Sequence, residues 1–342
     1  MGLNIAEIVP RKAIQLSDLK GKLIAVDASN IIYQFLSTIR QPDGTPLQDS
    51  KGNITSHLSG LFYRNVSLLL EGMRLVYVFD GKMPDLKYGT NKKRQDIKDK
   101  AEVKYREARE KGEFETAWKY ARQTVRLTSE IAEESKQLLK AMGIAVIQAP
   151  SEAEAQAAEV SRNSAYAVGS QDYDSLLFGA PRLLQNLTLA KKRKTASGFV
   201  YISPEIIELE KVLNSLEINL DQLICLGILV GTDYNPSGVK GIGPKKALAL
   251  VRSKKQPVLI FDEVAEQIRA QDEEGYGFDW QEIFGMFHQP EVVKNPEVDF
   301  PKINKDKIKK ILMDRDFSEE RINNQLLKLD EAKERAKQRT LF

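Results

Sequence analysis

Short apolar runs alternate with longer amphipathic stretches along residues 20–190. The runs are continuously apolar, as in strands buried on both faces. The stretches between them repeat apolar residues every three or four positions, which is typical of helices that pack on a core. Expected strands lie at 22–27, 75–80, 145–147, 165–168 and 182–187, and expected helices at 29–39, 57–70, 129–141 and from Pro150-Ser151 onward. This alternation predicts an α/β fold with a mostly parallel central sheet flanked by helices.

Two segments depart from this pattern. Residues 91–127 are highly charged and contain few large apolar residues, so they are poor core material. Because Lys, Glu, Arg and Ala favour helix, we expect one or two solvated helices there that project from the body. From Asn219 the chain becomes helical, with a glycine-rich turn between two helices and a charged, helix-prone tail from Asp306 onward.

Several of the expected strands end in acidic residues: Asp27, Asp80, and the pair Asp172 and Asp174. In open α/β sheets the carboxyl ends of the strands form the ligand site, so these side chains should converge at one edge. Two like charges 4 Å apart repel by roughly 4 kcal/mol at an effective dielectric of 20. Either their pKa values rise or a cation binds among them. Oxygen-only ligands suit Mg²⁺ or Mn²⁺.

Each acid also has an ordinary structural explanation. Asp27, Asp80 or one of the pair after 170 can be the N-cap of a following helix. Ser151 and Glu154 fit a capping box, with Ser as N-cap and Glu at N3, whereas Glu152 is explained less specifically. The recurrence of acids on several strands favours metal binding over separate caps.

The turn GVKGIGPKKA (238–247) lacks the Lys-Ser/Thr pair of a phosphate-cradling loop. It is similar to a helix–hairpin–helix turn, because Gly241 and Gly243 permit a tight bend and Pro244 suits the first helical position. Lys245 and Lys246, beside the amides at that helix N-terminus, would face a phosphate. The alternative is a plain loop with a solvated basic end.

Composition narrows the chemistry. The single Cys225 excludes an internal disulfide, and two histidines leave little material for a zinc site or a histidine base. The net charge is only +3, but residues 87–126 hold 13 Lys or Arg against 7 Asp or Glu. Basic segments beside acidic spots suit a protein that holds a polyanion and a metal ion together. No apolar run approaches the ~18 residues of a membrane span, and a secretory signal pattern is missing, so we expect an intracellular protein.

Six stretches form one pattern in sequence order: VDASNIIYQF (26–35), TSHLSGLFYR (55–64), YVFDGKMPDLK (77–87), APSEAEAQAA (149–158), GSQDYDSLLFG (169–179) and GTDYNPSGVKGIGPKKA (231–247). They cover most of residues 1–255, and the chain resembles the flap endonucleases, a family of structure-specific 5′ nucleases, in a compact archaeal form. The resemblance implies hydrolysis of a phosphodiester near the junction of a duplex and a 5′ flap, with 5′ exonuclease activity, in DNA replication (Okazaki fragment processing) and repair. It also implies a monomer in the cytoplasm or nucleoid of an archaeon, with no membrane association.

The resemblance assigns roles to individual residues. The residues that match the family's metal-binding carboxylates are Asp27, Asp80, Glu152, Glu154, Asp172, Asp174 and Asp233. They imply two Mg²⁺ ions per site, with Mn²⁺ as a substitute; spacing alone would make Asp233 an ordinary turn residue. Lys87 and Arg94 match the family's catalytic basic pair. The residues that match DNA-contacting positions are Gly2, Tyr33, Arg64, Gly241, Gly243, Lys245 and Lys246.

Among the DNA-contacting residues, Tyr33 matches the aromatic that stacks on a base, and Gly2 matches a processed N-terminus near the site. The sequence departs from the family pattern at the C-terminal peptide that binds a sliding clamp. Gln338, Leu341 and Phe342 begin the family's sliding-clamp peptide, but the sequence stops after one Phe. A motif that is cut short, a weak clamp site and a frayed charged tail all remain open.

The resemblance also divides the chain. The expected regions are an N-terminal nuclease region (1–100), a helical arch (87–127), an internal nuclease region (128–218), a helix–hairpin–helix DNA-binding region (219–256) and a C-terminal helical region (257–342).

Three other functions compete with a flap endonuclease: a bubble- or junction-cutting relative, a non-catalytic DNA-binding module and a ribonuclease of the related small-nuclease fold. The short, helix-prone arch favours the flap enzyme over relatives with very long insertions. The presence of all seven matching carboxylates argues against a dead module, and the helix–hairpin–helix turn argues against the ribonuclease.

Overall fold

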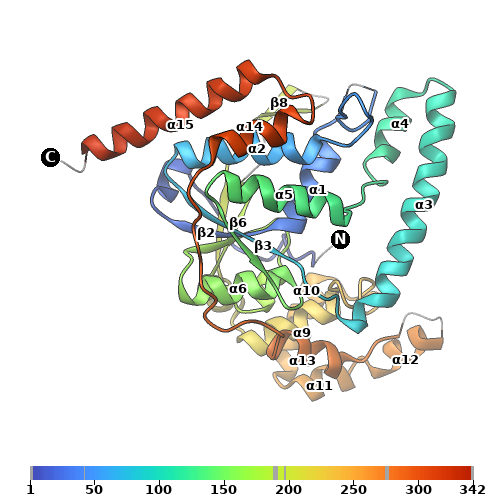
Figure 1. The fold of residues 1–342 in the computed structure, drawn as a ribbon. Coiled ribbons are helices and arrows are strands. Elements are labelled where there is room, and N and C mark those ends of the chain that lie inside the picture. The colour runs from blue at the N-terminus through green and yellow to red at the C-terminus, as the bar shows by residue number, and fades with distance from the viewer. Residues whose placement is uncertain (1–2, 42, 188–191, 196–197, 274–276, 340–342) are drawn as a thin grey trace.

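The computed structural model describes residues 3–41, 43–187, 192–195, 198–273 and 277–339. A seven-stranded sheet lies at its centre, in the order β1-β9-β6-β5-β2-β3-β4 (Figure 1). The five strands from β6 to β4 are mutually parallel, and β9 and β1 add an antiparallel edge. The strands are β1 (Lys12–Ala13), β2 (Leu23–Asp27), β3 (Arg74–Phe79), β4 (Ala145–Gln148), β5 (Ala167–Gly169), β6 (Arg182–Gln185) and β9 (Glu205–Glu208). The predicted α/β fold with a mostly parallel sheet is confirmed.

Successive residues of the central strands face two different cores. In β3, Leu75 and Tyr77 join the core on one face of the sheet, and Val76 and Val78 join the core on the other. Both faces are therefore covered, which explains why these strands are continuously apolar in sequence. The first core is covered by α1 (Ala28–Thr38), α2 (Ser56–Leu70), α5 (Ser129–Ala141), α14 (Lys305–Met313) and α15 (Glu319–Arg339).

The second core lies under helices that follow β4 and β5 and under the helical region after residue 219. Its helices are α6 (Ala153–Asn163), α7 (Asp174–Leu177), α8 (Leu209–Leu216), α9 (Leu220–Val230), α10 (Pro244–Lys254), α11 (Pro257–Asp262), α12 (Ala265–Glu273) and α13 (Trp280–His288). The single cysteine, Cys225, is buried in α9. The described residues also form two short 3₁₀ helices, η1 (Leu16–Leu19) and η2 (Asp85–Lys87).

Two helices stand away from the body. Figure 1 shows α3 (Tyr88–Glu110) as a long helix beside the sheet, with the shorter α4 (Phe114–Ala121) packed against it. This confirms the prediction of one or two projecting helices within the charged segment. The division of the chain into five functional regions stays a prediction.

The sequence pattern did not predict the short helices α7 and α8 or four of the described strands. These strands are the two-residue β1, the antiparallel β9, and the separate hairpin of β7 (Lys192–Thr195) with β8 (Gly198–Tyr201). β9 reads Glu-Ile-Ile-Glu, so its apolar run is too short to stand out from a loop. The strand expected to end at residue 187 instead ends at Gln185, because Asn186 takes a left-handed conformation with φ 62°.

Within the described residues, no single helix is long and apolar enough to cross a membrane. The consecutive helices α8 and α9 reach that length and composition only together, and they are bent by 81° relative to one another.

The contact between α1 and α2 depends on a glycine. A Cβ added at Gly60 would lie 2.2 Å from Cγ of Phe35, whose ring fills the gap between the two helices. We expect Gly60→Ala to lower the free energy of unfolding by roughly 1–3 kcal/mol through overpacking. Chemical denaturation followed by circular dichroism would measure this.

Gly285→Ala is the matched control, because Gly285 is also helical but has open space where a Cβ would lie. That variant should be unchanged or more stable by up to about 1 kcal/mol. Equal stability of Gly60→Ala and the wild type would show that α1 and α2 can move apart enough to admit a methyl group at no cost in free energy.

Candidate metal centre

Asp27 ends β2 and begins α1. Its Oδ1 accepts a hydrogen bond from the backbone N–H of Asn30 at 3.1 Å. Asp27 is therefore the N-cap of α1, a role that the sequence analysis gave as the alternative to metal binding. Asp27 pairs in register with Val78, two residues before Asp80 on the neighbouring parallel strand. The two carboxylates therefore leave the same edge of the sheet, where strands β2 and β3 end.

Asp80 is not the N-cap of a helix that follows it, contrary to the alternative expectation. It accepts hydrogen bonds from the backbone N–H of Ala153, at 2.8 Å, and from the hydroxyl of Ser29. The chain turns away after Asp80 because Gly81 packs tightly on another segment; a Cβ there would lie 2.1 Å from the carbonyl oxygen of Ala149. Asp80 thus caps α6 from a different part of the chain.

The capping box expected from Ser151 and Glu154 is wrong. The N-cap of α6 is Glu152, its side chain makes no capping bond, and the helix begins at Ala153. Asp80 takes the amide of Ala153, so the box is not needed to satisfy it. Glu152 instead accepts from Nζ of Lys87 and from the hydroxyl of Tyr234.

The Asp172 and Asp174 pair leaves the turn after β5. The backbone N–H of Asp172 donates to Oγ of Ser170 at 3.2 Å, and Nδ2 of Asn30 donates to Oδ2 of Asp172 at 2.8 Å. Asp174 is only 2% exposed and accepts from the backbone N–H of Leu3 at 3.3 Å. Neither acid is a helix N-cap, because α7 has Tyr173 in that position.

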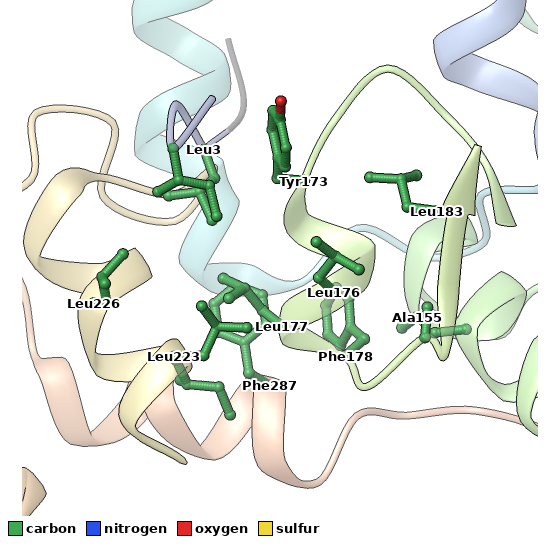
Figure 2. Packing of buried hydrophobic residues seen from close by; sticks show 14 of the residues in the cluster. Leu3, Ala155, Tyr173, Leu176, Leu177, Phe178, Leu183, Leu223, Leu226 and Phe287 are labelled. Atoms are coloured by element: carbon green, nitrogen blue, oxygen red, sulfur yellow. The ribbon is translucent and has the colours of Figure 1, made fainter. Parts of the chain in front are cut away.

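The apolar residues after this turn anchor it. Leu176, Leu177 and Phe178 are buried, and Figure 2 shows them gathered with residues of α9 and α13. The rings of Phe178 and Phe287 lie 4.8 Å apart between centroids. A Cβ on Gly227 of α9 would lie 2.7 Å from Leu177, so that contact is close. The acidic turn is therefore fixed to the second core.

A cleft of about 710 Å³ opens at this edge of the sheet. Six of the seven predicted ligands line it, namely Asp27, Asp80, Glu152, Glu154, Asp172 and Asp233. The seventh, Asp174, is buried and interacts electrostatically with Asp233 and Asp172. Tyr33 of α1 and the basic or polar residues Lys87, Gln95 and Lys98 also line the cleft. The structure thus brings together the acids that sequence reasoning and resemblance selected.

Crowding of carboxylates raises several pKa values. Burial raises the pKa of Asp27 well above its usual range, and the charge of Asp80 adds to the effect. Burial, with the charges of Asp233 and Asp172, raises the pKa of Asp174 to about 8. The pKa of Glu154 rises for the same reasons, with Asp174 as its main charged neighbour. These carboxylates are in a setting that favours a proton or a cation.

Lys87 supplies one positive charge. Its Nζ contacts Oε1 of Glu152, lies 3.6 Å from Oδ2 of Asp233 and lies 4.9 Å from the centre of the Tyr234 ring. Burial acts to lower the pKa of Lys87, but Glu152, Asp233 and Glu154 outweigh it and raise the pKa above its usual value. Lys87 is therefore charged at neutral pH and partly offsets the surrounding acids.

Among the described residues, no group of three or more His, Cys, Asp or Glu side chains is arranged so that it could hold a metal ion. The carboxylates are turned toward protein donors, such as Lys87 for Glu152 and Ser29 for Asp80. The donor set nevertheless fits a hard divalent cation, because it consists of carboxylate oxygens around one cleft.

Of the other predicted site residues, Tyr33 lines the cleft, Arg64 lies away from it, and Arg94 and Gly2 fall wholly or partly outside the described part. The exposed Tyr33 accepts a hydrogen bond from Nζ of Lys98 at 3.1 Å. Arg64 is half-buried in α2 and does not line the cleft. Arg94 is in α3, but its side chain is outside the described part, as is the whole of Gly2.

The expected helix–hairpin–helix turn has the predicted local geometry. Gly241 has φ +83°, Gly243 is the N-cap of α10 and Pro244 takes its first position. Lys246 donates to the carbonyl of Gly241 at 3.1 Å, and Lys245 is exposed and 3.4 Å from Glu7. Helices α9 and α10 pack against each other.

Sequence reasoning missed the polar residues that contact the acids: Ser29, Asn30 and Tyr234. They lie one to three residues after Asp27 or Asp233, yet an ordinary helix start or turn explains each of them locally. The only available signal was their position beside Asp27 and Asp233. At the C-terminus, Gln338 is in the last turn of α15, and Leu341 and Phe342 fall outside the described residues.

Comparisons with known proteins agree with this geometry. The XPG N-terminal domain matches residues 3–101, and the XPG I-region matches residues 143–233. The chain is 51% identical to flap endonuclease 1 of Pyrococcus furiosus, over 100% of this chain and 98% of that protein.

Two solved structures are also similar. Flap endonuclease-1 from Methanococcus jannaschii has a TM-score of 0.75 and 41% identity, covering 97% of this chain and 98% of that one. The catalytic core of Rad2 in complex with DNA substrate has a TM-score of 0.68 and 25% identity, covering 93% and 96%. The chain therefore belongs to the flap endonuclease family and is a structure-specific 5′ flap endonuclease.

Proposed function

We propose that the acids around the cleft bind two divalent cations that serve phosphodiester cleavage, Mg²⁺ in the cell with Mn²⁺ as a substitute. The proposed ligands are Asp27, Asp80, Glu152, Glu154, Asp172, Asp174 and Asp233. The proposal rests on the convergence of six of these carboxylates on one cleft, where burial and mutual repulsion raise the pKa of Asp27 and Glu154 and favour a proton or a cation. When bound, the ions would activate water and stabilise the departing oxygen.

The protein's own groups orient the substrate around that centre. Lys87 is charged and lies at the cleft wall, so its ammonium group can leave Glu152 for a phosphate oxygen and offset the charge that develops there. Arg94 is proposed as its partner on the strength of the matching motif alone. A histidine base is not needed, because the bound ions would activate the water and Lys87 would offset the charge on the phosphate.

DNA is proposed to approach the cleft from three sides. The exposed ring of Tyr33 would exchange its contact with Lys98 for stacking on a base. The projecting helices α3 and α4 would enclose the single-stranded flap, and Gly241, Gly243, Lys245 and Lys246 would hold duplex phosphates. Arg64, which lies outside the cleft, would contact the duplex elsewhere.

The remaining proposals concern the chain's context. We assign it 5′ exonuclease activity besides flap cleavage, roles in Okazaki fragment processing and repair, and action as a monomer. Helix α15 extends from the body toward the C-terminus (Figure 1), which suits a tail, including Gln338, Leu341 and Phe342, that binds a sliding clamp.

Removing one proposed ligand should abolish cutting but not binding. We expect Asp80→Ala and Asp172→Ala each to lower the single-turnover rate of flap cleavage by at least ~10²-fold, since a bound metal contributes several kcal/mol. Flap binding, followed by fluorescence anisotropy, should persist. Asp306→Ala, on the exposed start of α14, is the control and should cut normally. Near-normal cutting by either variant at saturating Mg²⁺ would remove that residue from the ligand set.

Cation binding should displace protons. The pKa of Asp174 is about 8, so this carboxyl group is largely protonated at pH 7 and must ionise to bind a metal. Affinity for Mn²⁺ should therefore rise as the pH rises toward 8. Calorimetry at pH 7 in two buffers of different ionisation enthalpy should report net proton release. Identical heats in both buffers would contradict the assignment.

The raised pKa of Asp174 also predicts how the stability of the metal-free protein changes with pH. A carboxyl group whose pKa is raised in the folded state contributes stability below its unfolded pKa, and that stability is lost as the pH rises through the folded value. The metal-free protein should thus lose thermal stability as the pH rises toward about 8, the pKa of Asp174. Asp174→Asn should lose less over the same range.

Binding of DNA phosphates by the helix–hairpin–helix turn should appear in the salt dependence of duplex affinity. Changing Lys245 and Lys246 together to Ala should weaken duplex binding and reduce the slope of log K against log salt by about 0.9 for each phosphate that the variant no longer neutralises. Changing Lys20 and Lys22, which are exposed at the opposite edge of the sheet, should leave the slope unchanged. An unaltered slope in the first variant would place the phosphate-binding residues elsewhere.

A further inference from the structure

Asn30 connects two of the acidic strand ends. It stands in the first turn of α1, where the strand order reverses between β2 and its neighbours β3 and β5. Its backbone N–H donates to Oδ1 of Asp27 at 3.1 Å, and its side-chain Nδ2 donates to Oδ2 of Asp172 at 2.8 Å. Its Oδ1 accepts from the backbone N–H of Gln171 at 3.1 Å. One residue thus contacts an acid from β2 and the acidic turn after β5.

The acidic turn is held from three sides. Oγ of Ser170 accepts from the N–H of Asp172 at 3.2 Å, inside the turn itself. Gln185, at the end of β6, donates to the carbonyl of Gln171 at 2.8 Å. Asn30 of α1 is the third residue that contacts the turn. Of Ser170, Gln185 and Asn30, it is Asn30 whose side chain donates to the carboxylate of Asp172. The direction of that carboxylate therefore depends on the Asn30 amide.

We propose that Asn30 is a positioning residue for Asp172 and thereby sets the affinity of the cleft for its divalent cation; this inference depends on the metal centre proposed above. The amide holds Oδ2 of Asp172 by a hydrogen bond and so fixes the direction in which that carboxylate faces the cleft. Groups that orient a metal ligand in this way typically change metal affinity 10- to 100-fold when they are removed.

The fold does not require this amide. Asp27 already caps α1, and that capping bond uses the backbone N–H of Asn30, which any residue except proline retains. The helix is anchored by buried Ile31, Ile32 and Phe35, on positions that a change at 30 leaves intact. Replacing the side chain should therefore loosen the acidic turn while α1 remains in place.

The test uses Asn30→Ala, which removes the amide, and Asn30→Leu, which removes its hydrogen bonds while keeping nearly the same volume. Thr38→Ala, on the exposed last turn of the same helix, is the control. Mn²⁺ binding to the DNA-free protein is measured from the electron paramagnetic resonance signal of free Mn²⁺. Flap cleavage is then measured against Mg²⁺ concentration, and melting temperature is measured without metal.

We expect both Asn30 variants to bind Mn²⁺ at least ~10-fold more weakly and to need correspondingly more Mg²⁺ for half-maximal cleavage. At saturating Mg²⁺ their kcat and their KM for the flap should return to wild-type values, because Asn30 orients a ligand and does not touch the reacting atoms. Thr38→Ala should match the wild type throughout.

Wild-type Mn²⁺ affinity in both variants would overturn the inference, even if their melting temperatures fell, because the amide would then serve folding alone. A lower kcat at saturating Mg²⁺ with unchanged affinity would overturn it as well and place Asn30 in the chemistry. If the wild-type protein itself bound no Mn²⁺, the proposed metal centre would fail first, and the role of Asn30 would fail with it. If Asn30→Ala does not fold, Asn30→Leu carries the test.

Discussion

Repulsion among carboxylates at the carboxyl edge of the sheet is the constraint on which this molecule depends. Parallel strands bring the ends of β2, β3 and β5 together, so their acids face one cleft. The folded chain offsets this repulsion in part with the half-buried cation Lys87 and with neutral donors such as Asn30. The raised pKa values show that the compensation is incomplete. The folded protein therefore keeps uncompensated negative charge at the cleft where we propose that the divalent cations bind.

Holding such a site together requires a rigid support on both sides of the sheet. The two apolar cores supply it, since successive residues of β3 alternate between them. The acidic turn is tied to the second core through Leu177 and Phe178, and α1 is tied to the first through Phe35. Helix α1, which follows Asp27, and the turn that carries Asp172 and Asp174 are thus fixed to different cores. Packing on both faces of the sheet, together with the hydrogen bonds of Asn30, sets the separation of these acids.

The sequence was sufficient for the parts of this arrangement that repeat. Apolar runs that each end in an acid predicted both the parallel sheet and the edge where Asp27 and Asp80 meet. The sequence was insufficient for hydrogen bonds between residues that are far apart along the chain. Local capping rules selected Ser151 and Glu154, whereas Asp80, 73 positions before Ala153, binds the first amide of α6. Asn30 and Asp172 are likewise 142 positions apart, and β9 was too short to show a pattern.

The hydrogen bond from Leu3 to the buried Asp174 has a practical consequence for handling the protein. A peptide tag fused to the N-terminus would be joined to the chain only two residues before Leu3, close enough in sequence to compete for the cations of the acidic cluster. Histidine tags would be the worst choice, because imidazole itself binds divalent metals. Purification handles belong at the far end, after α15, which Figure 1 shows extending away from the sheet.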